Sequence, residues 1–251
     1  MLTVIIPSYN RPQLLQQSLE ALKFQTSKDF TIIIVDDKSE KILEIEKVIE
    51  RYKPYLQVHL IKKPVKTGVQ ESRNIGLKTA KTEYVSLIDD DDYYKPNAIK
   101  SFSNFIKKDN SHDLIYAEAT VIDSQNNSIG VIGDYKVNNH KSEILKKCYI
   151  PSPTVLMKRE FVLNLGGFDK SFPSCQDWDT WIRVIHSEGK VGKIEDNISY
   201  YRKHNGPTIG KSIKSQLGYK KIYRKHFKKY LMYCLANFKV IYLAKVIKNL
   251  L

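Results

Sequence analysis

The sequence predicts an α/β protein in which a mainly parallel sheet is flanked by helices and followed by a C-terminal helical extension. Three observations support this fold. Short, β-branched apolar runs alternate in the first half with longer segments whose apolar residues have helical spacing. Polar clusters follow directly after three of these runs, and residues 211–251 contain eleven Lys or Arg and no acidic residue. Alternating strands and helices imply right-handed crossovers and parallel strands covered on both faces.

The first half is expected to contain four strands and three helices. The strands are the apolar runs at residues 3–7, 30–37, 56–63 and 84–90. The first helix should begin near Asn10 and Pro12, since both residue types are common at helix starts and leucines follow at helical spacing. The same spacing predicts helices at 42–52 and 71–81.

The second half is less regular. Its expected elements are strands at 113–123 and 198–207, a hairpin at 126–136, a strand and short helix within 151–168, and helices at 141–148 and 177–190. Gly166 and Gly167 should close the short helix and Gly189 the last one, because glycine is frequent just beyond helix C-termini.

Charge, cysteine content and hydropathy limit the class of protein. The net charge is +14, but residues 1–210 are nearly balanced, so the excess lies in the tail. Three widely separated cysteines favour reduced thiols in a cytosolic protein over a disulfide framework. The N-terminal "MLTVIIPSYN" lacks the basic flank of a signal peptide, and no run of about 18 uncharged apolar residues occurs. We therefore expect a cytoplasmic protein without a spanning helix.

Four consecutive aspartates, Asp89 to Asp92, follow the predicted strand 84–90. Ligands of parallel sheets bind beyond the carboxyl ends of the strands, so "PSYN", "DDKS" and "DDDD" should meet at one edge. An isolated acidic run is usually a solvated surface, but burying several carboxylates without a cation is costly. Mg²⁺ or Mn²⁺ would remove that cost, and Asp89 and Asp91 would point the same way on an extended backbone. An EF-hand is excluded, because its glycine and terminal glutamate are missing.

Four segments in order carry a family resemblance: "TVIIPSYNRP", "IIIVDDKS", "GVQESRNIGLKTAKTEYVSLIDDDD" and "QDWDTWIR". Together they resemble the family 2 glycosyltransferases, which are inverting enzymes of the GT-A fold that use nucleotide-diphosphate sugars. The resemblance covers roughly residues 1–205. It implies a GT-A domain over 1–208, with a nucleotide-sugar-binding half at 1–95 and an acceptor half at 96–208, followed by a basic amphipathic helical tail at 209–251.

The resemblance assigns residues to the donor. Pro7 and Tyr9 would line the nucleobase and ribose pocket, and Asp37 would accept a hydrogen bond from the base. Arg73 and Asn74 match the family's pair near the diphosphate and sugar. Three alternatives remain open: Tyr9 packs in the core, Asp37 caps the following helix, or Arg73 forms a structural bridge with Asp89 or Asp90.

The same resemblance assigns the metal site. Asp89 and Asp91 match the family's Asp-x-Asp, with Asp91 as the direct ligand of Mn²⁺ or Mg²⁺. The fourfold run leaves the register open by one position, so Asp90 remains a donor-side candidate, and Asp92 either holds the loop or touches the sugar. Arg202 and His204 resemble a late Arg-x-His segment that closes over the diphosphate or the metal. A structural histidine is the alternative for His204.

The acceptor side has Asp177, which matches the family's catalytic base. Gln176 replaces the usual glutamate before it, which removes a charge but leaves the base. A carboxylate stays ionised at neutral pH and can accept the proton of an attacking hydroxyl. The alternative is that Asp177 and Asp179 only favour a helix N-terminus. Trp178 and Trp181 are expected in the core rather than against a sugar.

The tail segment 218–231 divides into two halves on a helical wheel. The basic half holds Lys220, Lys221, Arg224, Lys225, Lys228 and Lys229, and the other half holds Tyr219, Ile222, Tyr223, His226 and Tyr230. Such a helix can rest on an anionic membrane surface, here the inner face of a bacterial cytoplasmic membrane. The alternative is that the apolar half packs on the domain and the lysines face water.

These observations predict a hexosyltransferase-like enzyme that moves one sugar from a nucleotide-diphosphate sugar, UDP-sugar by expectation, to a growing surface glycan such as lipopolysaccharide or capsule. The expected partners are that donor, a glycan or glycolipid acceptor and the membrane surface, and no nucleic acid. Single addition is expected because the Gln-x-x-Arg-Trp motif of processive relatives is absent. The competing hypotheses are an inactive nucleotide-sugar-binding protein and an RNA-binding protein driven by the tail. A sugar nucleotidyltransferase would need a glycine-rich loop, which "PSYNRP" is not.

Overall fold

The structure is a computed structural model that describes residues 1–203 and 212–248. Its first half alternates strands and helices as the sequence predicts. The elements are β1 (Leu2–Ser8), α1 (Pro12–Lys23), β2 (Phe30–Asp36), α2 (Ile42–Tyr52), β3 (Val58–Lys62), α3 (Val69–Thr79) and β4 (Tyr84–Leu87). Strands β3, β2, β1 and β4 lie side by side and are all parallel. Their carboxyl ends therefore share one edge of the sheet.

The second half completes the same sheet and supplies more helices. The elements are β5 (Tyr93–Tyr94), α4 (Ala98–Lys108), β6 (Leu114–Ile122), β7 (Ser128–Ile132), α5 (His140–Lys146), the 3₁₀ turn η1 (Ser152–Thr154), β8 (Leu156–Lys158), α6 (Arg159–Asn164), α7 (Gln176–His186) and β9 (Val191–Arg202). The strand order is β3-β2-β1-β4-β8-β6-β9-β5, with β7 paired to β6. Antiparallel pairing of β8 with β4 joins the two halves. The sheet is mixed overall: the four parallel strands of the first half are joined by a second parallel pair, β6 and β9.

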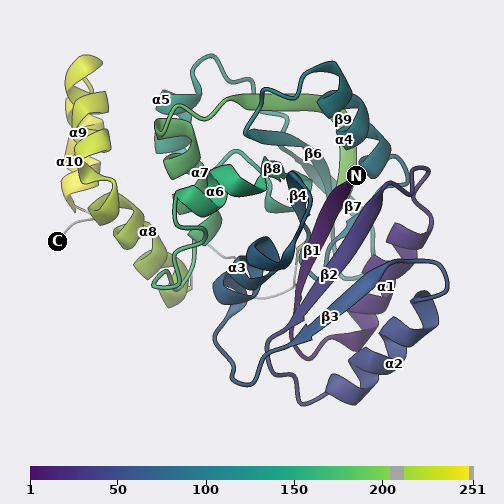
Figure 1. The fold of residues 1–251 in the computed structure, drawn as a ribbon. Coiled ribbons are helices and arrows are strands. Elements are labelled where there is room, and N and C mark those ends of the chain that lie inside the picture. Colours follow the sequence, from purple (N-terminus) through teal and green to yellow (C-terminus); the bar gives the residue numbers. More distant parts are fainter. Residues whose placement is uncertain (204–211, 249–251) are drawn as a thin grey trace.

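The two faces of the sheet bury separate cores, because alternate residues of a strand point to opposite faces. Val4 and Ile6 of β1 pack with α1, α2 and α4, whereas Ile5 packs with α3 and α7. Figure 1 shows α1 and α2 on one side of β1 to β3 and α3 on the other. Gly76 of α3 lies against Ile5, where an added Cβ would come within 2.4 Å of the isoleucine side chain. Helix α3 therefore approaches the sheet closely, just where it presents Arg73.

Two features of the second half differ from or refine the predictions. Helix α4 was not predicted, although Ala98, Ile99 and Phe102 form a buried helical face. The closing glycines are confirmed: Gly166 and Gly167 have φ of +89° and +66° just after α6, and Gly189 donates to the carbonyl of Val184 beyond α7. These turns fix where α6 ends and where α7 ends.

The tail consists of α8 (Ile213–Lys225), α9 (Phe227–Ala236) and α10 (Val240–Lys248). The prediction of one continuous amphipathic helix over 218–231 is therefore wrong, since the helix breaks at His226 between α8 and α9. Ile222, Tyr223 and Tyr230 of its apolar half are buried in the core that also holds the α7 tryptophans. That half packs on the domain, as the alternative interpretation held. Among the described residues, none of the helices has both the length and the hydropathy to cross a bilayer.

Candidate functional site

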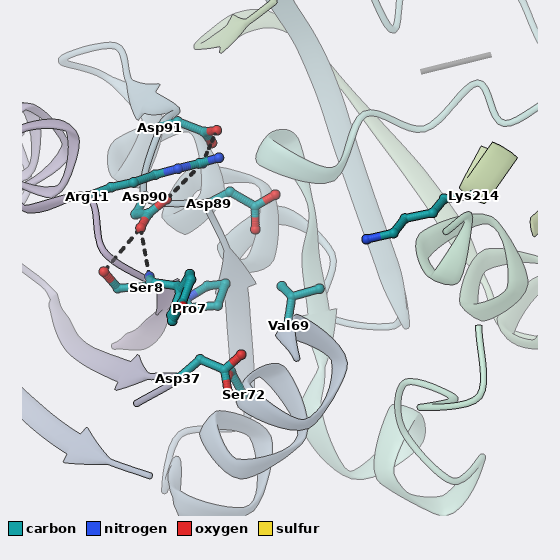
Figure 2. A pocket seen from close by; sticks show the side chains of 11 residues that line it. Pro7, Ser8, Arg11, Asp37, Val69, Ser72, Asp89, Asp90, Asp91 and Lys214 are labelled. Carbon is teal, nitrogen blue, oxygen red and sulfur yellow. Dashed lines mark hydrogen bonds and ion pairs between the residues drawn. The ribbon is translucent and has the colours of Figure 1, made fainter. Parts of the chain in front are cut away.

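A cleft of about 510 Å³ lies at the carboxyl ends of β1, β2 and β4 (Figure 2). Its lining comes from these strand ends, from α3 and from the tail: Pro7, Ser8, Tyr9, Arg11, Asp37, Val69, Ser72, Asp89, Asp90, Asp91 and Lys214. The three polar clusters expected to meet at this edge contribute Pro7 to Tyr9, Asp37, and Asp89 to Asp91. The cleft is the candidate site.

The aspartates form a tight turn, because the Asp92 amide donates to the Asp89 carbonyl at 3.1 Å. The extended backbone expected for Asp89 to Asp91 is therefore wrong. The turn still gathers carboxylates: single oxygens of Asp89, Asp91 and Asp92 lie within 4.8 Å of one another. Asp90 points elsewhere, so the cluster skips one position of the run.

Asp90 faces the end of β1 instead. Its carboxylate accepts hydrogen bonds from the Ser8 hydroxyl at 3.1 Å and the Tyr9 amide at 3.2 Å, and Arg11 lies 3.4 Å away. Burial, reinforced by the charge of Asp91, raises the pKa of Asp90 to about 7, although Arg11 and the Tyr9 amide oppose the rise. Asp90 therefore ties the aspartate turn to "PSYN".

The cluster has more negative charge than its surroundings neutralise. Burial and the neighbouring carboxylates raise the pKa of Asp89 and, further, that of Asp92. Arg11 forms an ion pair with Asp91 at 2.5 Å. Three hard carboxylate ligands gathered in one turn suit a divalent cation such as Mg²⁺ or Mn²⁺, which would compensate their repulsion. The donor set therefore fits the expected metal.

Arg73 joins the aspartate turn to the acceptor side. Its side chain is buried, its Nη2 donates to both oxygens of Asp89 at 2.8 and 3.1 Å, and its Nη1 donates to Asp177 in the first turn of α7. Burial lowers the pKa of Arg73, but Asp177 and Asp89 outweigh it and the pKa is raised. The bridging alternative therefore holds for Asp89 and not for Asp90. Asp177 does not line the cleft itself, but Arg73 links it to Asp89, which does.

Asp37 lies in the cleft and is buried. Its carboxylate accepts from Lys63 at 2.6 Å and from the amides of Thr67 and Gly68 at 2.8 and 2.9 Å. Capping of the following helix is therefore wrong for Asp37; it instead holds the loop before α3. The preceding aspartate, Asp36, accepts from the Ser39 amide at 2.8 Å.

Pro7 and Tyr9 both line the cleft, as expected for a nucleobase pocket. Tyr9 is only half-buried, and the Lys66 ammonium lies 3.7 Å from the centroid of its ring. The ring is thus accessible to a cation and is not a core residue.

Two expected donor residues have other partners in the structure. The Asn74 amide donates to the Phe168 carbonyl and accepts from the Phe168 amide, each at 2.8 Å, so it fixes the loop after α6. Arg202 is buried; its amide donates to Asp92 at 2.7 Å and its Nε to the Asp91 carbonyl at 3.1 Å. Neither residue lines the cleft, and both support residues that surround it. His204 lies outside the described residues.

Asp179 differs in role from Asp177, two positions before it. It is fully buried and pairs with Arg183 at 2.9 Å, with Lys225 at 2.9 Å and with His226 at 2.8 Å. These contacts fasten α8 to α7. Trp181 is fully buried and Trp178 nearly so, which confirms both as core residues.

Sequence reasoning missed Ser8, Arg11 and Lys214. Ser8 and Arg11 belong to the quoted "PSYNRP", so their neighbourhood was the available signal. Lys214 comes from α8, where the sequence indicates only a basic helix. Figure 2 shows its side chain extending toward the cleft from the side opposite Arg11.

Comparisons with known proteins agree with this geometry. The sequence profile described as Glycosyl transferase family 2 matches residues 3–162. The amylovoran biosynthesis glycosyltransferase AmsB of Erwinia amylovora is 28% identical over 84% of this chain and 75% of its own.

Two solved structures are similar in fold. S. aureus TarS 1-349 in complex with UDP-GlcNAc has a TM-score of 0.71 and 20% identity, over 92% of this chain and 66% of that one. The mannosyltransferase PcManGT from Pyrobaculum calidifontis, in complex with GDP-Man and Mn²⁺, has a TM-score of 0.70 and 15% identity, over 99% of this chain and 73% of that one. This chain thus spans about two thirds of the TarS structure that it matches.

Proposed function

The chain belongs to the family 2 glycosyltransferases and has their GT-A fold, and from this premise we propose that it transfers one sugar from a UDP-sugar to a growing bacterial surface glycan. The observation that carries the proposal is the Arg73 bridge between Asp89 and Asp177. It joins Asp89, a carboxylate of the cleft that would hold the metal, to Asp177, a partly exposed carboxylate of α7. Transfer to an acceptor needs both.

The donor would lie with its base near Pro7, Tyr9 and Asp37. Within the described residues the Asp37 Oδ2 accepts one hydrogen bond, from the Gly68 amide at 2.9 Å, so it keeps a lone pair for a uracil N–H. The Tyr9 face offers a stacking surface once Lys66 moves aside. Similar folds are solved with UDP-GlcNAc and with GDP-Man, which supports a nucleotide sugar without deciding the base.

Mn²⁺ or Mg²⁺ would be held by Asp91 and Asp89, with Asp92 completing the cluster. When bound, the ion supplies Lewis-acid stabilisation for the negative charge that grows on the leaving diphosphate. The similar mannosyltransferase structure is in complex with Mn²⁺. Arg202 would act indirectly, by holding the backbone of the aspartate turn.

Asp177 would be the base. The acceptor oxygen forms a bond to the anomeric carbon while the bond from that carbon to the diphosphate oxygen breaks. The hydroxyl proton passes to Asp177, and UDP leaves with the electron pair. Attack opposite the leaving group inverts the anomeric centre. Arg73 orients Asp177 through its Nη1 and places a positive charge beside the carboxylate that would receive the proton.

We assign donor binding and acceptor binding to different halves of the chain. Residues 1–95 would bind the donor and residues 96–208 the acceptor, and the helical tail is assigned to 209–251. Association with the inner face of the cytoplasmic membrane remains part of the proposal. Exposed Met232, Leu235 and Phe238 at the end of α9 would provide its apolar contact, and Lys228 is an exposed lysine on the same helix.

Release of UDP from a panel of UDP-sugars, with and without Mn²⁺, tests the proposal. We expect metal-dependent hydrolysis of one donor, and a fall of about 100-fold or more in Asp91→Ala, because diphosphate charge loses its main compensation. In Asp177→Asn, transfer to acceptor should fall by about 10²–10⁴-fold while donor binding persists.

The matched control is Asp29→Asn, since Asp29 precedes β2 at the opposite end of the strands from the cleft. It should behave as the intact protein does. If no UDP-sugar is hydrolysed and none binds by calorimetry with metal present, a UDP-sugar donor is excluded.

A further inference from the structure

A second concavity lies beside the candidate site, between α7, α8 and the end of α5. Its volume is about 650 Å³. We call it the α5–α7–α8 groove; its principal lining residues are three lysines and three aromatics, Lys146, Lys147, Lys220, Trp178, Tyr219 and Tyr223. No carboxylate is among the residues that line it. The groove therefore differs sharply in charge from the cleft.

The groove leads to the proposed base. Trp178, in its wall, is the residue after Asp177 on α7. Cys148 also lines it, and burial, with a smaller contribution from the Asp177 carboxylate, raises the pKa of that thiol. A ligand lying in the groove thus has one end near Asp177.

Helix α8 belongs to both concavities. Lys214 in its first turn lines the cleft, and Tyr219 and Lys220 line the groove. The helix is held there by Lys225 and His226, which pair with buried Asp179. The surface is therefore built by firm packing and not by a loosely attached tail.

The groove presents flat apolar walls to its contents. Tyr219 is 37% exposed and packs edge to face on Trp178, with ring centroids 5.7 Å apart. Aromatic walls with a few polar groups are the usual lining of small-molecule sites. A pyranose ring, with one apolar face and a rim of hydroxyls, matches a tyrosine wall beside the Gln216 side chain.

The lysines add a requirement for negative charge. Lys220 has no ion pair within residues 1–203 and 212–248, and the Lys147 ammonium lies 3.4 Å from the Tyr135 ring centroid. Only Lys146 has a carboxylate partner, Glu143 at 2.5 Å. A cationic concavity raises the local concentration of anions and disfavours cations.

We propose that the α5–α7–α8 groove binds the acceptor, and that this acceptor is a glycan whose sugars carry carboxylate or phosphate groups. The proposal rests on the proposed function, because it takes Asp177 as the base at the end of the groove. Tyr219 packs on a sugar ring, and Lys147 and Lys220 contact its anionic group. The charge of the groove thus selects the class of acceptor.

Intrinsic tryptophan fluorescence tests the proposal without any donor, since both tryptophans of the chain lie on α7. The probes are tetragalacturonate, the neutral cellotetraose and inorganic phosphate. We expect tetragalacturonate to bind about tenfold more tightly than either other probe, because two exposed lysine contacts together are worth about that factor. Lys147→Gln combined with Lys220→Gln should abolish this difference, and Tyr219→Leu should weaken both tetrasaccharides about fivefold.

Lys100→Gln is the control, because it removes one charge from an exposed lysine of α4, on the other face of the sheet from the groove. It should leave all three affinities unchanged. Equal binding of the two tetrasaccharides, no binding of either, equal losses in the control, or phosphate binding as tightly as tetragalacturonate would each overturn the proposal. Failure of the proposed function would appear separately, as absence of UDP-sugar binding in the cleft.

Discussion

The cleft and the α5–α7–α8 groove share helix α8 but have opposite charge. The cleft is lined by three aspartates of a single turn, Asp89, Asp90 and Asp91, whose charge Arg11 and Arg73 partly offset. The groove has three lysines and no carboxylate in its lining. The boundary between them is Asp177, which touches Arg73 on one side and precedes Trp178 on the other.

This difference shows how one protein can hold two anionic substrates side by side. A diphosphate needs a positive charge beside it, and the aspartate turn could offer one only by binding a metal ion. An anionic acceptor needs cations directly, and the lysines supply them without one. The acidic cleft would repel an anionic acceptor that brings no metal, whereas the lysines of the groove would attract it, so the charges would place the acceptor on the groove side of Asp177.

The largest expected effect is on stability and follows from removing the charge of Arg73, which lies beside Asp177. Arg73→Met would leave Asp89 and Asp177 facing each other without compensation, and we expect a loss of about 3 kcal/mol in the free energy of unfolding. The value lies at the lower end for a broken buried pair, because the side chains of Asp89 and Asp177 keep 36% and 26% exposure. Urea unfolding measures it.

Arg11→Met is the comparison for that experiment. Arg11 also pairs with two aspartates, but its side chain is 46% exposed, so the loss should stay below about 1 kcal/mol. Equal losses in the two variants would mean that Arg73 does not hold the boundary between the concavities.

A smaller effect, on the KM for the donor, is expected at Lys214, a tail residue that lines the cleft. Lys214→Ala should raise KM for the donor by about five- to tenfold, since an exposed ammonium facing a diphosphate is worth about 1 kcal/mol. Steady-state kinetics with Lys228→Ala as control measures the effect. An unchanged KM would mean that α8 contributes to the groove but not to donor binding in the cleft.

The cleft was largely predictable from the sequence, whereas the groove was not. Pro7, Tyr9, Asp37 and Asp89 follow strand ends, and in a parallel sheet all strand ends lie at one edge. The α/β fold and the GT-A resemblance were likewise confirmed, because the alternation of strand and helix patterns is a local signal.

What could not be predicted depends on contacts between distant segments. The groove arises from α8 packing on α7 through Asp179, Lys225 and His226, and a helical wheel cannot show which face finds a partner. For the same reason Asn74 and Arg202 were assigned to the donor, although their side chains bond to Phe168, Asp91 and neighbouring loops. Spacing identifies a polar residue near the site; only packing shows what it touches.

The smallest expected effect is a dependence of α8 docking on pH. Burial lowers the pKa of His226, although Asp179 opposes this, and Arg183, Lys225 and Lys229 add positive charge around the pair. Because the unfolded chain then binds a proton more readily than the folded one, stability is full above about pH 6.5 and falls as pH decreases toward the lowered value. The pKa of Asp179 is also lowered, by His226, Arg183 and Lys225 against the effect of burial, so a second loss begins below about pH 4.

Unfolding followed by tryptophan fluorescence between pH 7.5 and 5 should therefore show a decline, with a slope of at most about 1.4 kcal/mol per pH unit for each histidine. Burial also lowers the pKa of His140 and His186, so His226→Asn should remove only part of the slope. His59→Asn, at an exposed position on β3, should leave the slope intact. If both variants keep the full pH slope of the unfolding free energy, protonation of His226 does not loosen α8. The groove would then keep its shape at the lower pH values, where the pairing of His226 with Asp179 is predicted to weaken.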